Sequence, residues 1–179
     1  MKLYTKKGDR GETELAGGGW LLKDHHRVAA GGEIDELNAA IGMAIAACAD
    51  EALSAQLRQL QEHLLVIGSE LAAADPETLP RRITDGDVLM LEAWIDAASD
   101  EAGSPSSFIL PGGTEVAARL HQARAVCRRA ERGVVKLSRA LGVEPPVIAY
   151  TNRLSDLLFA MARVANKRAG VEDVAPSGR

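Results

Sequence analysis

The stretch His121-Gln-Ala-Arg-Ala-Val-Cys-Arg-Arg-Ala-Glu-Arg132 lies in a long segment whose periodicity predicts how the chain folds. Apolar residues recur through this segment at alternating steps of four and three, the repeat of one helix face that packs against a core. They are Val116, Leu120, Ala123, Cys127, Ala130, Val134, Leu137 and Leu141. We therefore expect one amphipathic helix over residues 114–141, buried along this stripe.

The same helix carries four arginines, Arg124, Arg128, Arg129 and Arg132, within nine residues. A guanidinium beside a core needs an anionic partner, because a partly desolvated charge is costly unless it is paired. One interpretation is salt bridges within or between subunits, in which Glu131 pairs with Arg128 or Arg132. The other is a polyphosphate or nucleotide site, since phosphates match the geometry of the guanidinium fork.

Composition limits the classes of function. A chain of 179 residues with 46% hydrophobic and 26% charged residues is typical of one soluble globular domain. Its net charge of −4 argues against a nucleic-acid coat or a membrane-surface protein, so any anion site must be local. We see no signal peptide and no apolar run of about 18 residues that would span a membrane.

Cysteine and histidine usage gives no metal signature. Cys48 and Cys127 form neither a disulfide framework nor a CxxC motif, which fits a reducing cytoplasm. The four histidines, His25, His26, His63 and His121, lack the spacing of a zinc site. We therefore predict no metal-ligating residues.

Helical periodicity predicts four further helices, over about residues 33–49, 53–74, 84–102 and 147–169. Thr84 and Asp87 resemble a capping box at the start of the third helix. Five helices with short connections predict an all-α, antiparallel five-helix bundle over residues 24–170. In this single domain, 1–179, a flexible N-terminal loop (1–23) precedes the bundle and a disordered tail (171–179) follows it.

The N-terminal loop is a candidate anion site. Lys6, Lys7 and Arg10 are interspersed with Gly8 and Gly11, and glycine lets successive backbone N–H groups turn toward one anion. The loop has no Walker A pattern, so by itself it could equally be a mobile arm.

Three other places carry candidate residues, each with a structural alternative. Asp35 and Glu36 suit the start of a helix; alternatively, Asp35 could pair with an arginine of the bundle or of another subunit, and Glu36 could approach a metal. Asn152 and Asp156 share a helix face and could cap, pair or bind a ligand. Phe108 lies in a Ser/Pro/Gly-rich loop, where it could plug a bundle end or line a hydrophobic pocket.

Six blocks, taken in order, resemble the PduO-type cobalamin adenosyltransferases over nearly the whole chain. They are Tyr4-Thr-Lys-Lys-Gly-Asp-Arg-Gly11, Lys23-Asp24, Ile34-Asp-Glu-Leu-Asn38, Phe108-Ile-Leu-Pro-Gly-Gly113, Arg124-Ala-Val-Cys-Arg-Arg-Ala-Glu-Arg132 and Asn152-Arg-Leu-Ser-Asp156. The resemblance implies a homotrimer of five-helix bundles with active sites between subunits. It implies transfer of the 5′-deoxyadenosyl group from ATP to cob(I)alamin, with triphosphate as leaving group, Mg²⁺ as helper and a reductase as electron donor.

The resemblance also implies roles for particular residues. The nucleotide-contact positions are Thr5, Lys6, Lys7, Gly8, Thr13, Glu14 and Lys23 on one subunit, with Arg128, Arg129, Ala130, Glu131, Arg132 and Asn152 on the next. The catalytic positions are Arg128, Phe108, which displaces the lower axial ligand of cobalt, and Asp35 with Arg124, a pair that bridges subunits beside the corrinoid.

Acidic residues motivate an alternative function. Glu33 stands where the family pattern leads us to expect a threonine-like residue, and Glu12 and Glu14 place negative charge in the presumed phosphate loop. A binding or delivery protein for adenosylcobalamin or a nucleotide, catalytically weak on the same fold, would account for them. A helical interaction scaffold is the third possibility.

Overall fold

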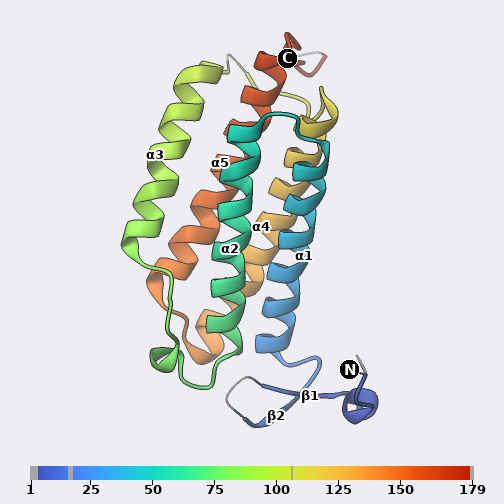
Figure 1. Cartoon of the computed structure of the whole chain (residues 1–179), viewed down its shortest axis with the longest axis vertical. Helices are drawn as coiled ribbons and strands as arrows, with labels where there is room; N and C mark the ends of the chain where they lie inside the picture. Colours follow the sequence, from blue (N-terminus) through green and yellow to red (C-terminus); the bar gives the residue numbers. More distant parts are fainter. Residues whose placement is uncertain (1–3, 16–17, 106, 178–179) are drawn as a thin grey trace.

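A computed structural model describes residues 4–15, 18–105 and 107–177, and in this part of the chain five helices form an antiparallel bundle (Figure 1). The helices are α1 (His26–Ala47), α2 (Glu51–Ala72), α3 (Asp85–Ala102), α4 (Glu115–Leu141) and α5 (Pro145–Arg168). The predicted all-α class and five-helix bundle are therefore confirmed. Within the described ranges, no helix has the length and hydrophobicity needed to cross a membrane.

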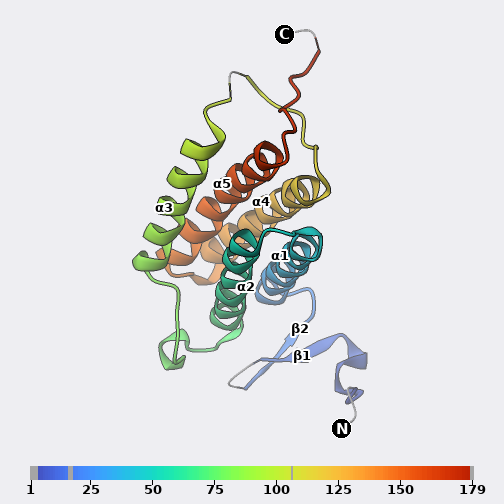
Figure 2. The ribbon, with the colours of Figure 1, turned by 45° about the horizontal axis from the view of Figure 1, so that its top comes forward.

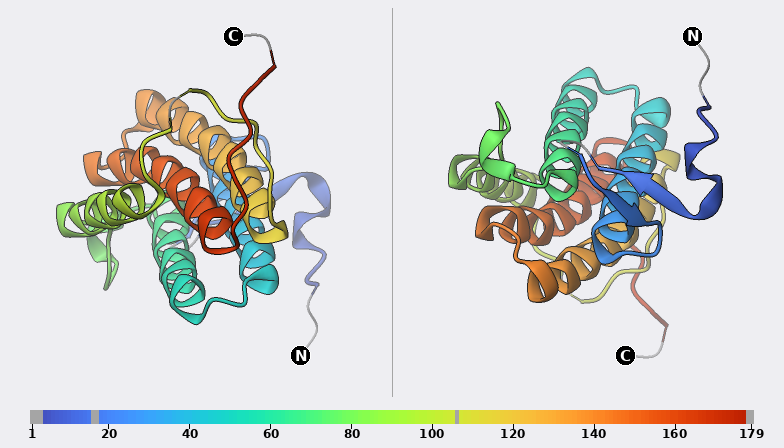
Figure 3. Two further views of the ribbon diagram at one scale, coloured as in Figure 1. Left: turned by 90° about the horizontal axis from the view of Figure 1, so that it is seen from above. Right: turned by 90° about the horizontal axis from the view of Figure 1, so that it is seen from below.

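Helix α4 lies between α1 and α5, while α2 packs on α1 and α3 packs on α5 (Figure 3). The stripe predicted for α4 is buried from Leu120 to Leu137, whereas Val116 is half-buried and Leu141 is exposed. Helix α5 is buried over most of its circumference because it contacts both α3 and α4. The core is therefore continuous through the two helices that carry the candidate site.

Side-chain caps fix the helix starts. Asp50 and Thr114 accept hydrogen bonds from the backbone N–H groups of Leu53 and Ala117. The predicted capping box of Thr84 and Asp87 is present in full. Helix α1 begins at His26, seven residues before the predicted start.

The early start of α1 has a physical reason. Gly31 and Gly32 weaken a helix by about 1 kcal/mol each relative to alanine, so the sequence pattern argued against helix there. Ala30 and Ile34 are buried in the core on either side of them. Tertiary packing therefore overrides the local preference.

The N-terminal segment, residues 4–15 and 18–23, is more ordered than the loop we expected. It contains a 3₁₀ turn, η1 (Lys7–Arg10), and a hairpin of β1 (Glu12–Glu14) and β2 (Trp20–Leu22), in which Thr13 pairs with Leu21. These strands are too short to show alternation in the sequence. The hairpin projects beyond the N-terminal end of α1 (Figure 2). A second 3₁₀ turn, η2 (Pro76–Thr78), lies between α2 and α3.

The tail also differs from the expectation of disorder. Asp173 accepts a 2.8 Å hydrogen bond from Arg163 Nε, and the carbonyl of Val174 accepts one from the N–H of Leu110. Residues 171–177 are thereby attached to α5 and to the loop before α4. Residues 178–179 lie outside the described residues.

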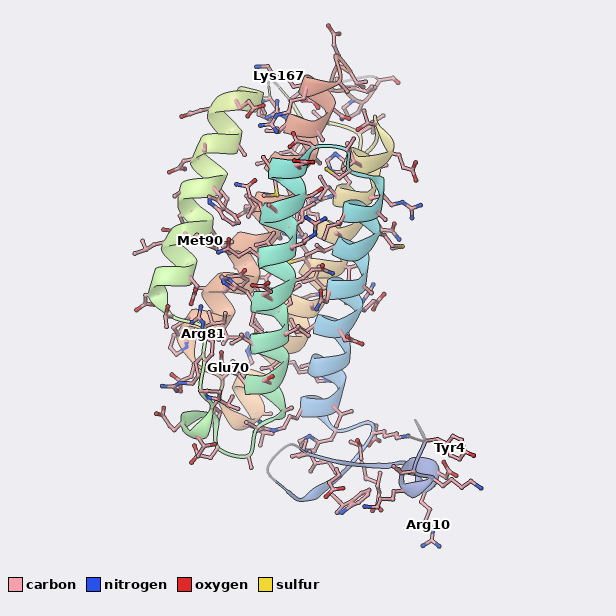
Figure 4. The ribbon with its side chains drawn as sticks, viewed as in Figure 1. Tyr4, Arg10, Glu70, Arg81, Met90 and Lys167 are labelled. Atoms are coloured by element: carbon pink, nitrogen blue, oxygen red, sulfur yellow. The ribbon has the colours of Figure 1, made fainter. Side chains whose placement is uncertain are left out.

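A paired polar cluster joins the middle of α2 to the first turns of α3 and α5. The hydroxyl of Tyr150 lies 3.0 Å from His63 Nδ1, and His63 Nε2 lies 3.8 Å from Asp87. Burial alone would raise the pKa of Asp87, but hydrogen bonds from Arg81 and Thr84 outweigh it and lower the pKa to about 2. The Asp87 carboxylate therefore stabilises the folded state as an anion. Figure 4 labels Arg81 beside the start of α3.

Replacing Asp87 with asparagine should lower the free energy of unfolding at pH 7 by about 1–2 kcal/mol. Because the folded pKa lies below the unfolded value, this contribution is complete above about pH 5 and declines as the pH falls toward 2. Urea denaturation of the parent and of Asp87→Asn between pH 7 and pH 3 measures the difference between their free energies of unfolding, hereafter the gap. The exposed neighbour Asp85, changed to asparagine, is the matched control. A gap that stays constant down to pH 3 would contradict the assignment.

Candidate functional site

A cationic groove runs along the C-terminal half of α4. It has a volume of about 560 Å³, and its lining residues, hereafter the α4 groove, are Arg128, Glu131, Arg132, Val135, Lys136, Arg139 and Ala140. Four of these carry a positive charge and one a negative charge. The groove is therefore suited to an anion with several charges.

The two arginines at the centre of the groove are free of carboxylate partners within the described residues. Arg128 and Arg132 are exposed, and Arg132 donates to the backbone carbonyl of Arg128 at 2.8 Å. Glu131 pairs with neither among the described residues, so the salt bridges that we considered for it within one chain do not form, while pairing between subunits stays a prediction. Its Oε1 instead accepts a 3.0 Å hydrogen bond from Asn152 Nδ2. The guanidinium groups thus remain available to a ligand.

Asn152 is held in place from the other side. Its Oδ1 accepts a 2.8 Å hydrogen bond from Arg153, whose Nε donates to Glu92 on α3 at 2.9 Å. A chain of polar contacts therefore joins α3, α5 and the groove residue Glu131. Asp156, which we grouped with Asn152, is exposed.

Two members of the predicted 128–132 contact set interact with their own chain instead. Arg129 forms a 2.5 Å ion pair with Glu36 on α1. Ala130 has no exposed surface, so its side chain is part of the core and cannot reach a ligand. Glu36 thus meets an arginine, a role that we considered for Asp35, whereas for Glu36 the alternative that we considered was a metal.

The N-terminal segment gathers several of the predicted nucleotide contacts. A Cβ atom at Gly8 would lie 3.1 Å from Lys23 Nζ, so glycine at this position lets the ammonium group approach the turn. Lys6 has a left-handed φ of 62°, and Thr5 Oγ1 accepts a hydrogen bond from the N–H of Lys7. Thr13 is half-buried in β1. The 3₁₀ turn and β2 therefore bring Lys23 close to the start of the segment.

Acidic residues reduce the charge of this segment. Lys7 Nζ lies 3.9 Å from Glu14 and 6.0 Å from the centre of the Trp20 ring. Within the described residues, no hydrogen bond or ion pair joins the segment to α4, and it projects outside the bundle with Tyr4 and Arg10 far along it (Figure 4). A single chain thus does not unite the N-terminal segment with the α4 groove.

A second pocket, hereafter the Phe108 pocket, lies at the opposite end of α4. It has a volume of about 550 Å³. Its lining residues are Pro105, Ser107, Phe108, Ile109 and Pro111 of the loop before α4, with His121, Arg124 and Phe159. Phe108 is 78% exposed, so it does not plug the bundle end. Asn166 of α5 holds the end of the loop: it accepts from the N–H of Thr114 and donates to the carbonyl of Gly112.

The predicted pair of Asp35 and Arg124 is separated in one chain. Asp35 is exposed and lines a groove between α1 and α2, whereas Arg124 lies in the Phe108 pocket with its guanidinium 6.0 Å from the centre of the Phe159 ring. Among the described residues, no three His, Cys, Asp or Glu side chains gather in a group that could hold a metal ion.

Sequence reasoning missed two features beside these pockets. His121 is 4% exposed and both ring nitrogens lack a hydrogen-bond partner among the described residues. Its position directly after Leu120 of the stripe was the available signal. The carboxylate of Glu33 packs against the Cα of Gly133, and its buried Oε2 is also unpaired there. That contact requires glycine on α4, which no pattern within α1 reveals.

A sequence model of the cobalamin adenosyltransferase family matches residues 3–165. The corrinoid adenosyltransferase of Bacillus subtilis (strain 168) is 46% identical over 178 residues, covering 97% of this chain and 91% of that protein. Corrinoid adenosyltransferase PduO of Salmonella typhimurium is 42% identical, covering 94% of this chain. The chain spans about half, 51%, of the length of PduO.

Solved structures agree with the sequence comparisons. A phenylalanine-to-alanine variant of the PduO-type ATP:corrinoid adenosyltransferase from Lactobacillus reuteri, complexed with cobalamin and ATP, superposes with a TM-score of 0.92 at 38% identity. The match covers 99% of this chain and 100% of that one. An arginine-to-lysine variant of that enzyme, complexed with ATP, gives a TM-score of 0.91 at 37% identity over 97% and 99% of the two chains. On these grounds the chain belongs to the cobalamin adenosyltransferase family.

Proposed function

We propose that this chain is an ATP:corrinoid adenosyltransferase, which transfers the 5′-deoxyadenosyl group of ATP to the cobalt of cob(I)alamin or a related corrinoid. The observation that carries the proposal is the α4 groove, where Arg128 and Arg132 are exposed beside Lys136 and Arg139 without a carboxylate partner. Relatives that match along the chain are named for this activity, and a solved relative binds both cobalamin and ATP.

In this reaction the protein stabilises the charge of the leaving group, and it does not supply the nucleophile. The electron pair of Co(I) forms the bond to C5′ as the C5′–O bond breaks, and the electrons leave with triphosphate. The α4 groove presents fixed positive charges to that leaving group as its charge develops. Cys127, the thiol within the arginine stretch, is not available as a nucleophile, because burial raises its pKa to about 12.

We infer that the active site lies between subunits of a homotrimer. The N-terminal segment carries Lys6, Lys7 and Lys23 but lies beyond the end of its own bundle, and the α4 groove is open. A neighbouring copy would bring the segment of one chain over the groove of the next. The same arrangement would place Asp35 of one chain against Arg124 of another.

Cobalt chemistry suits the Phe108 pocket. Cobalt(II) is hard to reduce while a lower axial ligand is bound, and an exposed phenylalanine on a fixed loop can exclude that ligand. A phenylalanine and an arginine are also the residue types changed in the two solved variants of the Lactobacillus reuteri enzyme.

Two further components, Mg²⁺ and a reductase, and a location in the cell complete the proposal. Mg²⁺ would screen the phosphate charges of ATP, held mainly by phosphate oxygens and water, with Glu131 as the acidic side chain in the groove. A reductase would supply electrons to cobalt. Two free cysteines fit a cytoplasmic setting.

One observation favours the alternative of a catalytically weak binding or delivery protein. Glu14 lies 3.9 Å from Lys7 and offsets part of the positive charge that the N-terminal segment offers to ATP. Anaerobic incubation with ATP and chemically reduced cobalamin separates the two functions. An enzyme releases triphosphate and forms a light-sensitive product, whereas a delivery protein does neither.

Changing Arg128 to alanine should lower kcat/KM by about 10²–10³-fold, because a charge that stabilises the leaving triphosphate is lost. The helical circular dichroism should not change, since Arg128 is exposed. Triphosphate release under anaerobic conditions measures the rate. Arg119→Ala is the matched control, because Arg119 lies on the same helix outside the groove and pairs with Glu115. Parent-like kinetics in Arg128→Ala would reject the role.

Changing Phe108 to alanine should reduce the formation of cobalt(II) without a lower axial ligand by about tenfold or more, since an exposed hydrophobic wedge is removed. Electron paramagnetic resonance and absorbance spectra of bound cob(II)alamin, recorded with ATP present, report the ligand state. Leu110→Ala serves as the control, because Leu110 is 51% exposed in the same loop but does not line the pocket. Spectra identical to those of the parent protein would count against the assignment.

A further inference from the structure

The Phe108 pocket contains a buried histidine, His121, that the proposed chemistry at cobalt and the proposed pairing of Arg124 with Asp35 leave unexplained. Most of its wall is apolar, formed by Pro105, Phe108, Ile109, Pro111 and the ring of Phe159, with Ser107 beside them. At its inner side on α4 lie His121 and Arg124, and the His121 ring stands 5.9 Å from that of Phe159, centre to centre. One α4 face therefore offers two nitrogen-bearing side chains to an otherwise hydrophobic cavity.

These side chains are unpaired in the described part of the chain. His121 is 4% exposed, and neither Nδ1 nor Nε2 makes a hydrogen bond. Arg124 Nε is likewise buried without a partner. A buried donor or acceptor without a partner costs about 1–3 kcal/mol, so natural proteins rarely leave three such atoms together. A ligand that enters the pocket with matching groups would remove that cost.

The protonation state of His121 limits which functional group of a ligand it can bind. Burial lowers the pKa of His121, and the nearby Arg124 cation lowers it further, while Asp173 opposes them. The ring is therefore neutral at pH 7 and offers one N–H donor and one acceptor nitrogen. Arg124 Nε adds a donor. A carboxylate could accept from the ring N–H and from Arg124 but has no donor for the acceptor nitrogen, whereas a primary amide supplies an oxygen and N–H groups that satisfy both kinds of atom.

We propose that His121, with Arg124, binds a primary carboxamide of the corrinoid periphery in the Phe108 pocket, and so favours amidated corrinoids over their carboxylate precursors. This rests on the proposed function, because acetamide and propionamide substituents are what a corrinoid presents around its ring. The hydrophobic wall contacts the ring edge, and His121 selects the substituent. His121 thus acts as a binding and specificity residue, distinct from the cobalt-facing role of Phe108.

The test measures corrinoid affinity rather than turnover. Anaerobic titrations, with ATP present, follow the absorbance of cobalt(II) cobyric acid, which is amidated, and of cobyrinic acid, which is not. The proteins are the parent, His121→Phe, which keeps a flat buried ring without polar atoms, and His121→Gln, which keeps a donor and an acceptor. The affinity for ATP alone and the melting temperature report any general damage to the fold.

We expect the parent to bind cobyric acid about tenfold more tightly than His121→Phe does, with ATP affinity unchanged. His121→Gln should keep most of the parent affinity. The preference for cobyric over cobyrinic acid should fall by about fivefold or more in His121→Phe, since the histidine and the amide act as one pair.

Three outcomes would overturn the proposal. Parent-like affinity in His121→Phe rejects any contact with the corrinoid. Equal losses of corrinoid affinity in His121→Phe and His121→Gln would show that His121 only contributes packing. An unchanged preference between the two corrinoids would exclude the amide. A parent protein that binds neither corrinoid would overturn the proposed function as well, whereas the first three leave that function standing.

Discussion

The structure depends on how α4 divides its surface between the core and charged ligands. One stripe, from Leu120 to Leu137, is buried between α1 and α5, and this fixes the rotation of the helix. With that rotation set, Arg129 points at Glu36 on α1 and forms an internal ion pair. Arg128 and Arg132, on the outer side, find no such acid in the part of the chain that the structure describes. The apolar stripe therefore decides which arginines stabilise the fold and which remain for an anion.

The same division separates the two ends of α4. Its C-terminal half is mainly cationic and open, whereas its N-terminal half faces the apolar loop that carries Phe108. A polyphosphate and a largely hydrophobic ring system need different surroundings, and one rigid helix spaces them. Asn166 attaches the end of this loop, at Gly112 and Thr114, to α5. The bundle thus fixes the positions of the site residues that lie on helices, whereas the N-terminal segment lies outside the bundle.

The sequence predicted what depends on one helix at a time. Periodicity located all five helices, and the stripe of α4 predicted its buried face. It could not predict which partners meet across helices, because that depends on the relative rotation and height of two elements. Glu131 therefore pairs with Asn152 on α5, not with an arginine on its own helix. The pairing of β1 with β2 was missed for a different reason, since three-residue strands are too short for a period-2 pattern. The family resemblance indicated the candidate residues, but it stays a prediction that residues of two subunits form one active site.

Buried polar side chains differ in whether they have hydrogen-bond partners. Where they are paired, they only stabilise the fold; where they are unpaired, we infer that another molecule binds. Between α2, α3 and α5, His63 contacts Tyr150 and Asp87 receives Arg81, so each buried polar side chain has a neighbour. On α4 at the Phe108 pocket, His121 is equally buried but has none among the described residues. Since both clusters cost desolvation, a fold under selection for stability alone would have filled the second with apolar side chains. A neutral histidine kept there is best explained by a polar group that arrives with the ligand.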